Sequence, residues 1–207
     1  MKINNIQRQK RRARYTITLS NGDVFGISEG VFISSGLAIG DTVEKDRLLS
    51  IIQKENISKI KDSAYLLLSY RSRSKHELKT RLLEKEYTLN DIFPVLKELE
   101  QLGLINDQSF IESYIRDQVH LKKLGPFALK ASIIKFKVED VLVESAIDKI
   151  YKKYPVPDLI QELLLKKMKI LAKPIDDNSK SKLINFLKRK GFSWADIEPK
   201  LIENGIL

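Results

Sequence analysis

Residues 74–103 of the chain read SKHELKTRLLEKEYTLNDIFPVLKELEQLG. The first four letters, Ser74 to Glu77, form a capping box, in which serine and glutamate side chains satisfy open N–H groups at a helix start. Apolar residues follow at steps of four, five, five, four and three: Leu78, Leu82, Tyr87, Ile92, Leu96 and Leu99. Steps of three and four share one helix face, and the fives mark a corner. Two helices are therefore expected, one through Glu86 and one capped by Thr88 and Asp91 that ends before Gly103.

The same spacing of apolar residues occurs twice more in the chain. It returns 51 residues later and again 54 residues after that, and only the sixth place of the last copy, Asn204, is not apolar. The second copy is Leu129, Ile133, Val138, Val143, Ile147 and Ile150, and the third is Leu183, Leu187, Phe192, Ile197 and Leu201. A long fixed period indicates stacked supersecondary units, and such arrays usually serve as binding surfaces.

Each pair of helices is preceded by a third, so the simplest division has three-helix repeats at 60–105, 106–154 and 155–207. In the second repeat, Asp107 is expected to cap the long first helix, and Gly125-Pro126 to start the next one, because proline fits the first helical turn. The third repeat is expected to have helices near 158–172, 179–190 and 193–204.

Residues 1–59 form an N-terminal β extension and a linking helix in this division. Alternating apolar and polar residues on both sides of Asn21-Gly22 predict a hairpin, with Lys2–Gln7 as a third strand. A short connection, Val31–Leu37, and an amphipathic helix, Asp46–Lys54, are expected to lead into the repeats. So small a sheet must pack on something else. The expected fold class is mainly α, with tandem three-helix repeats and a small N-terminal sheet.

Composition restricts the function classes. The chain has no cysteine, which excludes disulfides, a thiolate nucleophile and thiolate metal sites. No apolar run reaches the roughly 18 residues of a membrane span, so a cytoplasmic protein that does not enter the membrane is expected. No long exposed apolar seam is evident either, which favours a monomer.

Catalytic and metal-binding patterns are weak, so no enzyme, metal or cofactor is expected. Gly26-Ile27-Ser28-Glu29-Gly30 matches G-x-S-x-G, but it ends a hairpin instead of lying on a large parallel sheet. The two histidines, His76 and His120, have no partner nearby in sequence. Asp176-Asp177 and Glu139-Asp140 are ordinary loop and first-turn acids. Phosphate-binding glycine motifs are absent.

Positive charge is the strongest functional signal. The net charge is +10, with a dense run between Arg8 and Arg14, and the middle helix of each repeat is basic where the last is acidic. Such helices predict a basic track for a periodic polyanion or a protein filament. The candidate contact residues are Arg8, Lys10, Arg11, Arg12, Arg14, Arg71, Arg73, Lys75, Lys79, Arg81, Lys122, Lys123, Lys130, Lys137, Lys188, Arg189 and Lys190.

Several of these segments resemble the RecX family of regulatory proteins. The resemblance is carried by the run Ala64–Arg71, by Arg73-Ser74-Lys75-His76-Glu77-Leu78 with Leu82, and by Leu99–Phe110 with Tyr114 and Arg116. It extends from about Ile60 to the C-terminus. Family members commonly show Lys-Gly before the last helix of a repeat, which this chain keeps only at Lys190-Gly191.

The resemblance implies an elongated, curved array of three repeats that lies in the groove of the RecA filament on DNA. Restraint of strand exchange and of the filament's ATPase is implied as well, without a cofactor or catalysis, in the setting of DNA repair, homologous recombination and the SOS response. Direct contact with single- or double-stranded DNA is a further expectation. Two alternatives stay open: a helix-turn-helix transcriptional regulator, disfavoured because its recognition helices are acidic, and a hydrolase acting through Ser28.

Overall fold

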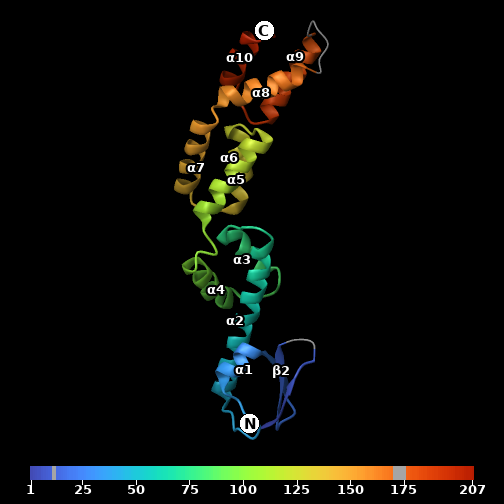
Figure 1. The fold of residues 1–207 in the computed structure, drawn as a ribbon, viewed down its shortest axis with the longest axis vertical. Coiled ribbons are helices and arrows are strands. Elements are labelled where there is room, and N and C mark those ends of the chain that lie inside the picture. The colour runs from blue at the N-terminus through green and yellow to red at the C-terminus, as the bar shows by residue number, and fades with distance from the viewer. Residues whose placement is uncertain (11–12, 170–175) are drawn as a thin grey trace. The chain divides into compact units, whose positions relative to one another are not determined.

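A computed structural model of the chain describes residues 1–10, 13–169 and 176–207. Within these ranges it has ten α-helices, one 3-10 helix and one three-stranded antiparallel sheet (Figure 1). The mainly helical class with a small N-terminal sheet is confirmed. The chain divides into two compact units, which are described separately below. Unit 1 comprises Met1–Ser72 and Leu78–Leu104, and unit 2 comprises Arg73–Glu77 and Ile105–Leu207.

Unit 1 begins with the predicted sheet. Strands β1 (Ile3–Arg8), β2 (Arg14–Leu19) and β3 (Val24–Ser28) pair in that order, and β2 and β3 are joined across the expected turn. One face of the sheet is apolar and packs on α1 (Glu29–Ser35) and α2 (Lys45–Tyr70). The buried side chains of this core are Ile3, Ile17, Leu19, Ile27, Val31, Leu37, Val43 and Ile51. The sheet thus packs on helices, as its small size requires.

Two expectations about the connection were wrong. The segment expected as a short link contains the helix α1. The separate linking helix expected at Asp46–Lys54 is the first part of α2, which continues for 26 residues. The physical reason is that residues 45–70 contain neither proline nor glycine, so nothing ends the helix. The buried residues Ile51, Ile60 and Ala64 hold α2 against its neighbours along its length.

Helices α3 (Lys75–Leu83) and α4 (Leu89–Gln101) lie on either side of the corner predicted from the sequence. The serine half of the capping box is confirmed, since the Glu77 N–H donates to Ser74 Oγ at 3.1 Å. Thr88 caps α4 by accepting from the Asp91 N–H at 3.3 Å. However, α3 ends at Leu83, three residues before the expected Glu86.

The described part of unit 2 contains seven helical elements that share one apolar cluster. They are α5 (Asp107–Lys122), α6 (Pro126–Ile133), the 3-10 helix η1 (Ile134–Phe136), α7 (Asp140–Lys153), α8 (Val156–Met168), α9 (Asp177–Arg189) and α10 (Trp194–Glu203). Their buried side chains form one cluster that runs from Phe110 to Ile206. Helix α8 was expected to continue to Ala172, which lies outside the described residues.

One predicted cap belongs to another helix. The cap of α5 is Asn106, whose side chain accepts from the Ser109 N–H at 2.8 Å. Asp107 instead accepts from the Lys75 N–H at 2.7 Å and so stabilises the start of α3. A contact between segments this far apart in the chain leaves no local signal in the sequence.

The corner of each repeat contains one residue in the left-handed conformation. These residues are Glu86 (φ 65°), Lys137 (φ 46°) and Gly191 (φ 90°), which occupy corresponding places before the last helix of each repeat. The two side chains that replace the glycine therefore keep the same corner geometry.

In unit 2, each corner accepts hydrogen bonds from the start of the middle helix of the preceding repeat. The buried Ser74 Oγ donates to the Phe136 carbonyl at 3.0 Å. In the same way, the Gly125 N–H donates to the Lys190 carbonyl at 2.8 Å, and the Phe127 N–H to the Gly191 carbonyl at 3.1 Å. At the start of α6, open N–H groups are thus satisfied by the next corner, whereas at α3 the bond to the corner comes from the cap side chain.

Candidate partner-binding surface

The N-terminal basic run is partly used for folding. Arg14, the first residue of β2, donates to the Gly26 carbonyl at 3.0 Å and to Glu55 at 2.6 Å. Arg8 pairs with Glu29 at 3.2 Å and is largely exposed. Lys10 is exposed, and the candidates Arg11 and Arg12 lie outside the described residues. Arg14 is therefore not placed to contact a partner.

Glu55 on α2 explains the position of Arg14. Its side chain is buried and also accepts from the Ser28 N–H at 2.7 Å, while Lys59 approaches to 3.8 Å. The Ser28 hydroxyl lies 3.3 Å from the Ser58 hydroxyl. The G-x-S-x-G motif thus anchors the sheet to α2 through backbone and hydroxyl contacts, and neither Glu55 nor Ser58 is the imidazole that a nucleophile elbow requires.

The basic residues of the first repeat differ in exposure. Arg73 is only 11% exposed and bonds Glu77 within the first turn of α3. Arg81 is half-exposed and pairs with Glu84 at 2.9 Å. Arg71 is exposed, whereas Lys75 and Lys79 are half-buried. The buried Arg73 stabilises the helix start and offers little surface to a partner.

The second repeat contributes two paired and two exposed candidates. Lys123, with a side chain that is 19% exposed, pairs with Glu162 at 2.8 Å. Lys130 pairs with Glu144 at 2.8 Å across the surface. Exposed ion pairs contribute little to stability and open readily. Lys122, the last residue of α5, and Lys137, in the corner after η1, are exposed.

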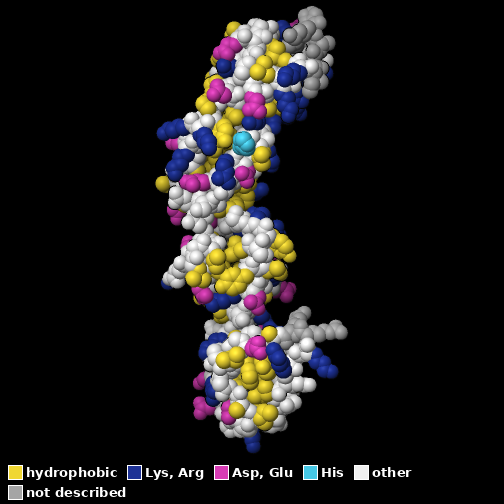
Figure 2. Space-filling model, in the orientation of Figure 1, with side chains coloured by type: hydrophobic (Ala, Val, Ile, Leu, Met, Phe, Trp, Pro, Cys, Tyr) yellow, Lys and Arg dark blue, Asp and Glu magenta, His cyan; other side chains and the backbone are white. Residues whose placement is uncertain are grey.

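The third repeat has exposed basic side chains on α9. Lys188 and Arg189 are exposed and, together with Lys182 and Asn185, line a hollow of about 630 Å³ on α9. The Lys188 ammonium lies 5.5 Å from the ring centroid of Trp194. Figure 2 shows Lys and Arg side chains gathered beside α8 and α9 on the face in view.

Lys190 joins the second and third repeats. Its Nζ donates to the Lys122 carbonyl at 2.6 Å. Burial, followed by the positive charges of Lys122, Lys166 and Lys167, lowers the pKa of Lys190. We call these four residues the lysine cluster. Lys166 and Lys167 were not among the sequence candidates, although two adjacent lysines in the last turn of a helix were a readable signal.

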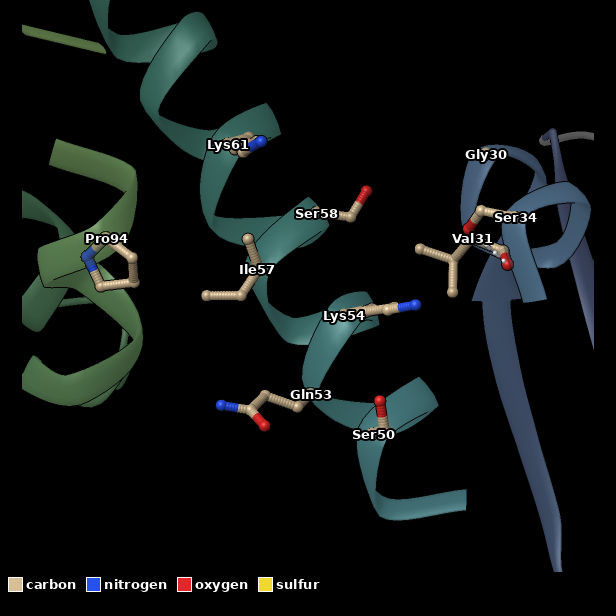
Figure 3. A pocket seen from close by; sticks show the side chains of 10 residues that line it. All are labelled: Gly30, Val31, Ser34, Ser50, Gln53, Lys54, Ile57, Ser58, Lys61 and Pro94. Atoms are coloured by element: carbon tan, nitrogen blue, oxygen red, sulfur yellow. Dashed lines mark hydrogen bonds between the residues drawn. The ribbon is translucent and has the colours of Figure 1, made fainter. Parts of the chain in front are cut away.

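Unit 1 has a separate hollow of about 610 Å³ along α2. Figure 3 shows Lys54 and Ser58 on the side of α2 toward Val31 and Ser34, while Ile57 lies on the side toward Pro94 of α4. The described residues that line it carry hydroxyl, amide and ammonium groups but no carboxylate or imidazole. They do not form an acid–base pair.

The described ranges contain neither a metal-binding cluster nor a membrane-spanning helix. Among residues 1–10, 13–169 and 176–207, no three acidic, histidine or cysteine side chains lie close enough together to hold a metal ion. In that same part of the chain, no helix has the length and apolar character needed to cross a membrane.

Comparisons with known proteins agree on one family. A family model for the RecX first three-helix domain matches residues 61–99. A regulatory protein RecX of Pelodictyon phaeoclathratiforme is 33% identical over 138 residues, which cover 67% of this chain and 84% of the relative. Another, of Clostridium acetobutylicum, is 28% identical over 209 residues, covering 97% of this chain and 95% of the relative.

Solved structures share the fold. A crystal structure of a regulatory protein RecX superimposes with a TM-score of 0.72 at 24% identity, covering 95% of this chain and 97% of that one. RecX from Lactobacillus salivarius gives a TM-score of 0.65 at 26% identity, covering 74% and 99%. The resemblance read from the sequence thus extends to the three-dimensional structure.

Proposed function

Because the chain belongs to the RecX family of regulatory proteins, we propose that it binds the RecA nucleoprotein filament and restrains its recombinase and ATPase activities. It acts in the cytoplasm as a monomeric, non-catalytic regulator, without a cofactor. Family membership is the single observation that carries the proposal. The exposed basic side chains of unit 2 support it, because they suit a partner that contains DNA, whose phosphates carry negative charge.

The proposal also assigns contact or folding roles to the parts of the chain. Repeats at 60–105, 106–154 and 155–207 present the contact residues, and residues 1–59 add a basic hairpin. Among the candidate residues, we retain those with exposed side chains, chiefly Lys122, Lys137, Lys188 and Arg189. We assign folding roles to Arg14 and Arg73, because their side chains are mostly buried in ion pairs.

The direct test measures RecA activity. RecA-driven strand exchange and ATP hydrolysis are followed with and without this protein, and its binding to random duplexes is measured alongside. We expect both RecA activities to fall as the protein is added. No effect on either activity, combined with tight preference for one duplex sequence, would instead identify a helix-turn-helix transcriptional regulator.

A charge-reversal pair tests the surface. Lys188→Glu with Arg189→Glu is expected to weaken filament association at least tenfold, because two attractive contacts become repulsive. The matched control is Lys152→Glu with Lys153→Glu, an exposed basic pair in the last turn of α7 in which Lys153 likewise lies over an aromatic ring. Equal losses in both variants would show that only net charge matters and would remove the assignment.

A further inference from the structure

Helix α2 changes its packing partners along its length. Near its start, Ile51 belongs to the N-terminal core together with side chains of the sheet and α1. Farther along, Lys61 pairs with Glu98 of α4 at 2.7 Å. Between these contacts one face of α2 is covered by neither neighbour, and the hollow of about 610 Å³ lies over that face.

The floor of this hollow is a stripe of α2. Ser50, Lys54, Ile57 and Lys61 line it and are four, three and four residues apart, so they share one helix face. At 1.5 Å per residue the stripe is roughly 16 Å long. Figure 3 shows Lys54 on the side toward α1 and Ile57 on the side toward Pro94 of α4. We call this elongated hollow, with one cationic and one apolar side, the α2 groove.

Three polar side chains of the α2 groove have no partner within the described part of the chain. The Ser50 hydroxyl, the Gln53 amide and the Lys54 ammonium group are exposed and make no hydrogen bond or ion pair there. Each of these groups can donate a hydrogen bond. Lys61 is neutralised by Glu98, and none of the described lining residues is acidic. Lys54 therefore leaves the groove with a net positive charge.

The apolar side offers contact surface to a ligand. Ile57 is half-buried, and Pro94 lies exposed within α4. Phe93, the residue before Pro94, is 66% exposed. A ligand that uses both sides of the groove needs apolar groups for Ile57 and Pro94 and an anionic group for Lys54.

The dimensions of the groove favour one class of ligand. A compact anion such as phosphate would meet Lys54 and leave Ile57 and Pro94 uncovered. A nucleic acid would gain little, because a single unpaired lysine offers one phosphate contact. About five residues of extended peptide, at about 3.3 Å each, match the length of the stripe. Successive side chains of such a peptide point to opposite sides, so alternating acidic and apolar residues would suit the two sides of the groove.

We propose that the α2 groove binds a short acidic segment of another protein in an extended conformation. Its carboxylates face Lys54, with Ser50 and Gln53 as hydrogen-bond donors, and its apolar side chains pack on Ile57 and Pro94. The proposal goes beyond the proposed function, because the site lies in unit 1 and needs no DNA. It gives the chain a protein-binding site that does not use the basic residues of unit 2.

The test uses the full chain, isotope-labelled for NMR, and an acetylated hexapeptide that alternates glutamate and leucine. We expect the backbone amide signals of residues 50–61 and 30–34 to shift on addition of the peptide. Anisotropy of a fluorescein-labelled copy should give a dissociation constant below about 1 mM. A hexapeptide with glutamine in place of glutamate should bind at least fivefold more weakly, because it lacks the charge that faces Lys54.

Variants of α2 test the position of the site. Lys54→Glu should weaken binding of the acidic peptide at least tenfold, because attraction becomes repulsion. The matched control is Lys45→Glu, which reverses another exposed lysine of α2 outside the groove and should leave affinity within about twofold. Ser50→Trp fills the groove without a change of charge and should also weaken binding at least tenfold. Circular dichroism checks that each variant folds.

Several outcomes would overturn the proposal. They are an absence of shifts at the groove residues, equal affinities for the glutamate and glutamine peptides, and equal losses in Lys54→Glu and Lys45→Glu. Displacement of the peptide by inorganic phosphate or by an oligothymidine at lower concentration than the peptide itself would contradict it too, since the groove would then be an anion or nucleic-acid site. RecA is absent from every measurement, so these outcomes are independent of those that test the proposed function.

Discussion

Three residues at corresponding corners, Glu86, Lys137 and Gly191, have positive φ values. A side chain in this region costs about 1 to 2 kcal/mol, because its Cβ crowds the following carbonyl. The family pattern of glycine at this place has a clear physical reason, yet the chain tolerates glutamate and lysine at two corners. Gly191 differs because its neighbours leave no room: an added Cβ would lie 2.3 Å from the Ala128 nitrogen.

A pair of substitutions separates backbone strain from crowding. Lys137→Gly should stabilise the fold by about 0.5 to 1 kcal/mol, since the relief of strain exceeds the added chain entropy. Gly191→Ala should destabilise it by about 3 kcal/mol or more, because strain and steric overlap add. Urea unfolding followed by circular dichroism measures both free energies.

Gly205→Ala is the control for that pair. Gly205 has a similar φ of 64°, but nothing lies within 4 Å of an added Cβ. Its substitution should cost only the strain, about 1 kcal/mol. If Gly191→Ala were no worse than Gly205→Ala, the close approach of the corner to α6 would not be present in solution.

The start of helix α3 is stabilised from three places in the chain. Ser74 caps it locally through the Glu77 N–H, and Asp107 accepts from the Lys75 N–H. Ser74 also donates its hydroxyl proton to the Phe136 carbonyl. The same element of the next repeat, α6, is held at its start by the carbonyls of the Lys190-Gly191 corner. Hydrogen bonds between helix starts and corners therefore connect one repeat to the next.

The double role of Ser74 is measurable. Ser74→Ala should destabilise the chain by about 2 to 3 kcal/mol, because it removes a helix cap and leaves a buried carbonyl without its donor. Thr88→Ala removes a cap alone, at an exposed site, and should cost about 1 kcal/mol. Equal free-energy losses for Ser74→Ala and Thr88→Ala in thermal or urea unfolding would contradict a stabilising bond between Ser74 and the Phe136 carbonyl.

At the scale of the whole molecule, each unit contains a cluster of buried apolar side chains. Among the described residues of unit 2, one apolar cluster includes side chains from Phe110 to Ile206, so the helices α5–α7 and α8–α10 share buried surface. The N-terminal core of unit 1 joins the sheet to α1 and α2. The sequence division into three repeats remains a proposal about structural units, while we expect cooperative folding to follow the shared cores.

Fragments of the chain test which helices unfold together in one cooperative transition. Residues 106–207 should fold alone and unfold in a single transition, because their core is complete within them. Residues 155–207 should be mostly unfolded, since separation from α5–α7 exposes the apolar side chains that pack across the repeats. Circular dichroism during heating measures both, and a folded 155–207 fragment would contradict the shared core.

The sequence alone determined the helical repeats, because apolar spacing and caps act within a few residues: the six-place pattern beginning at Leu78 and the caps Ser74 and Thr88 appear as predicted. It also determined the N-terminal hairpin through Asn21-Gly22. The tertiary structure decided which charges stay available. Arg14 and Arg73 are held in partly buried ion pairs, Asp107 caps a helix distant in sequence, and Lys166 and Lys167 lie near Lys122 and Lys190. Such pairings depend on distances between segments far apart in the chain, about which local spacing carries no information.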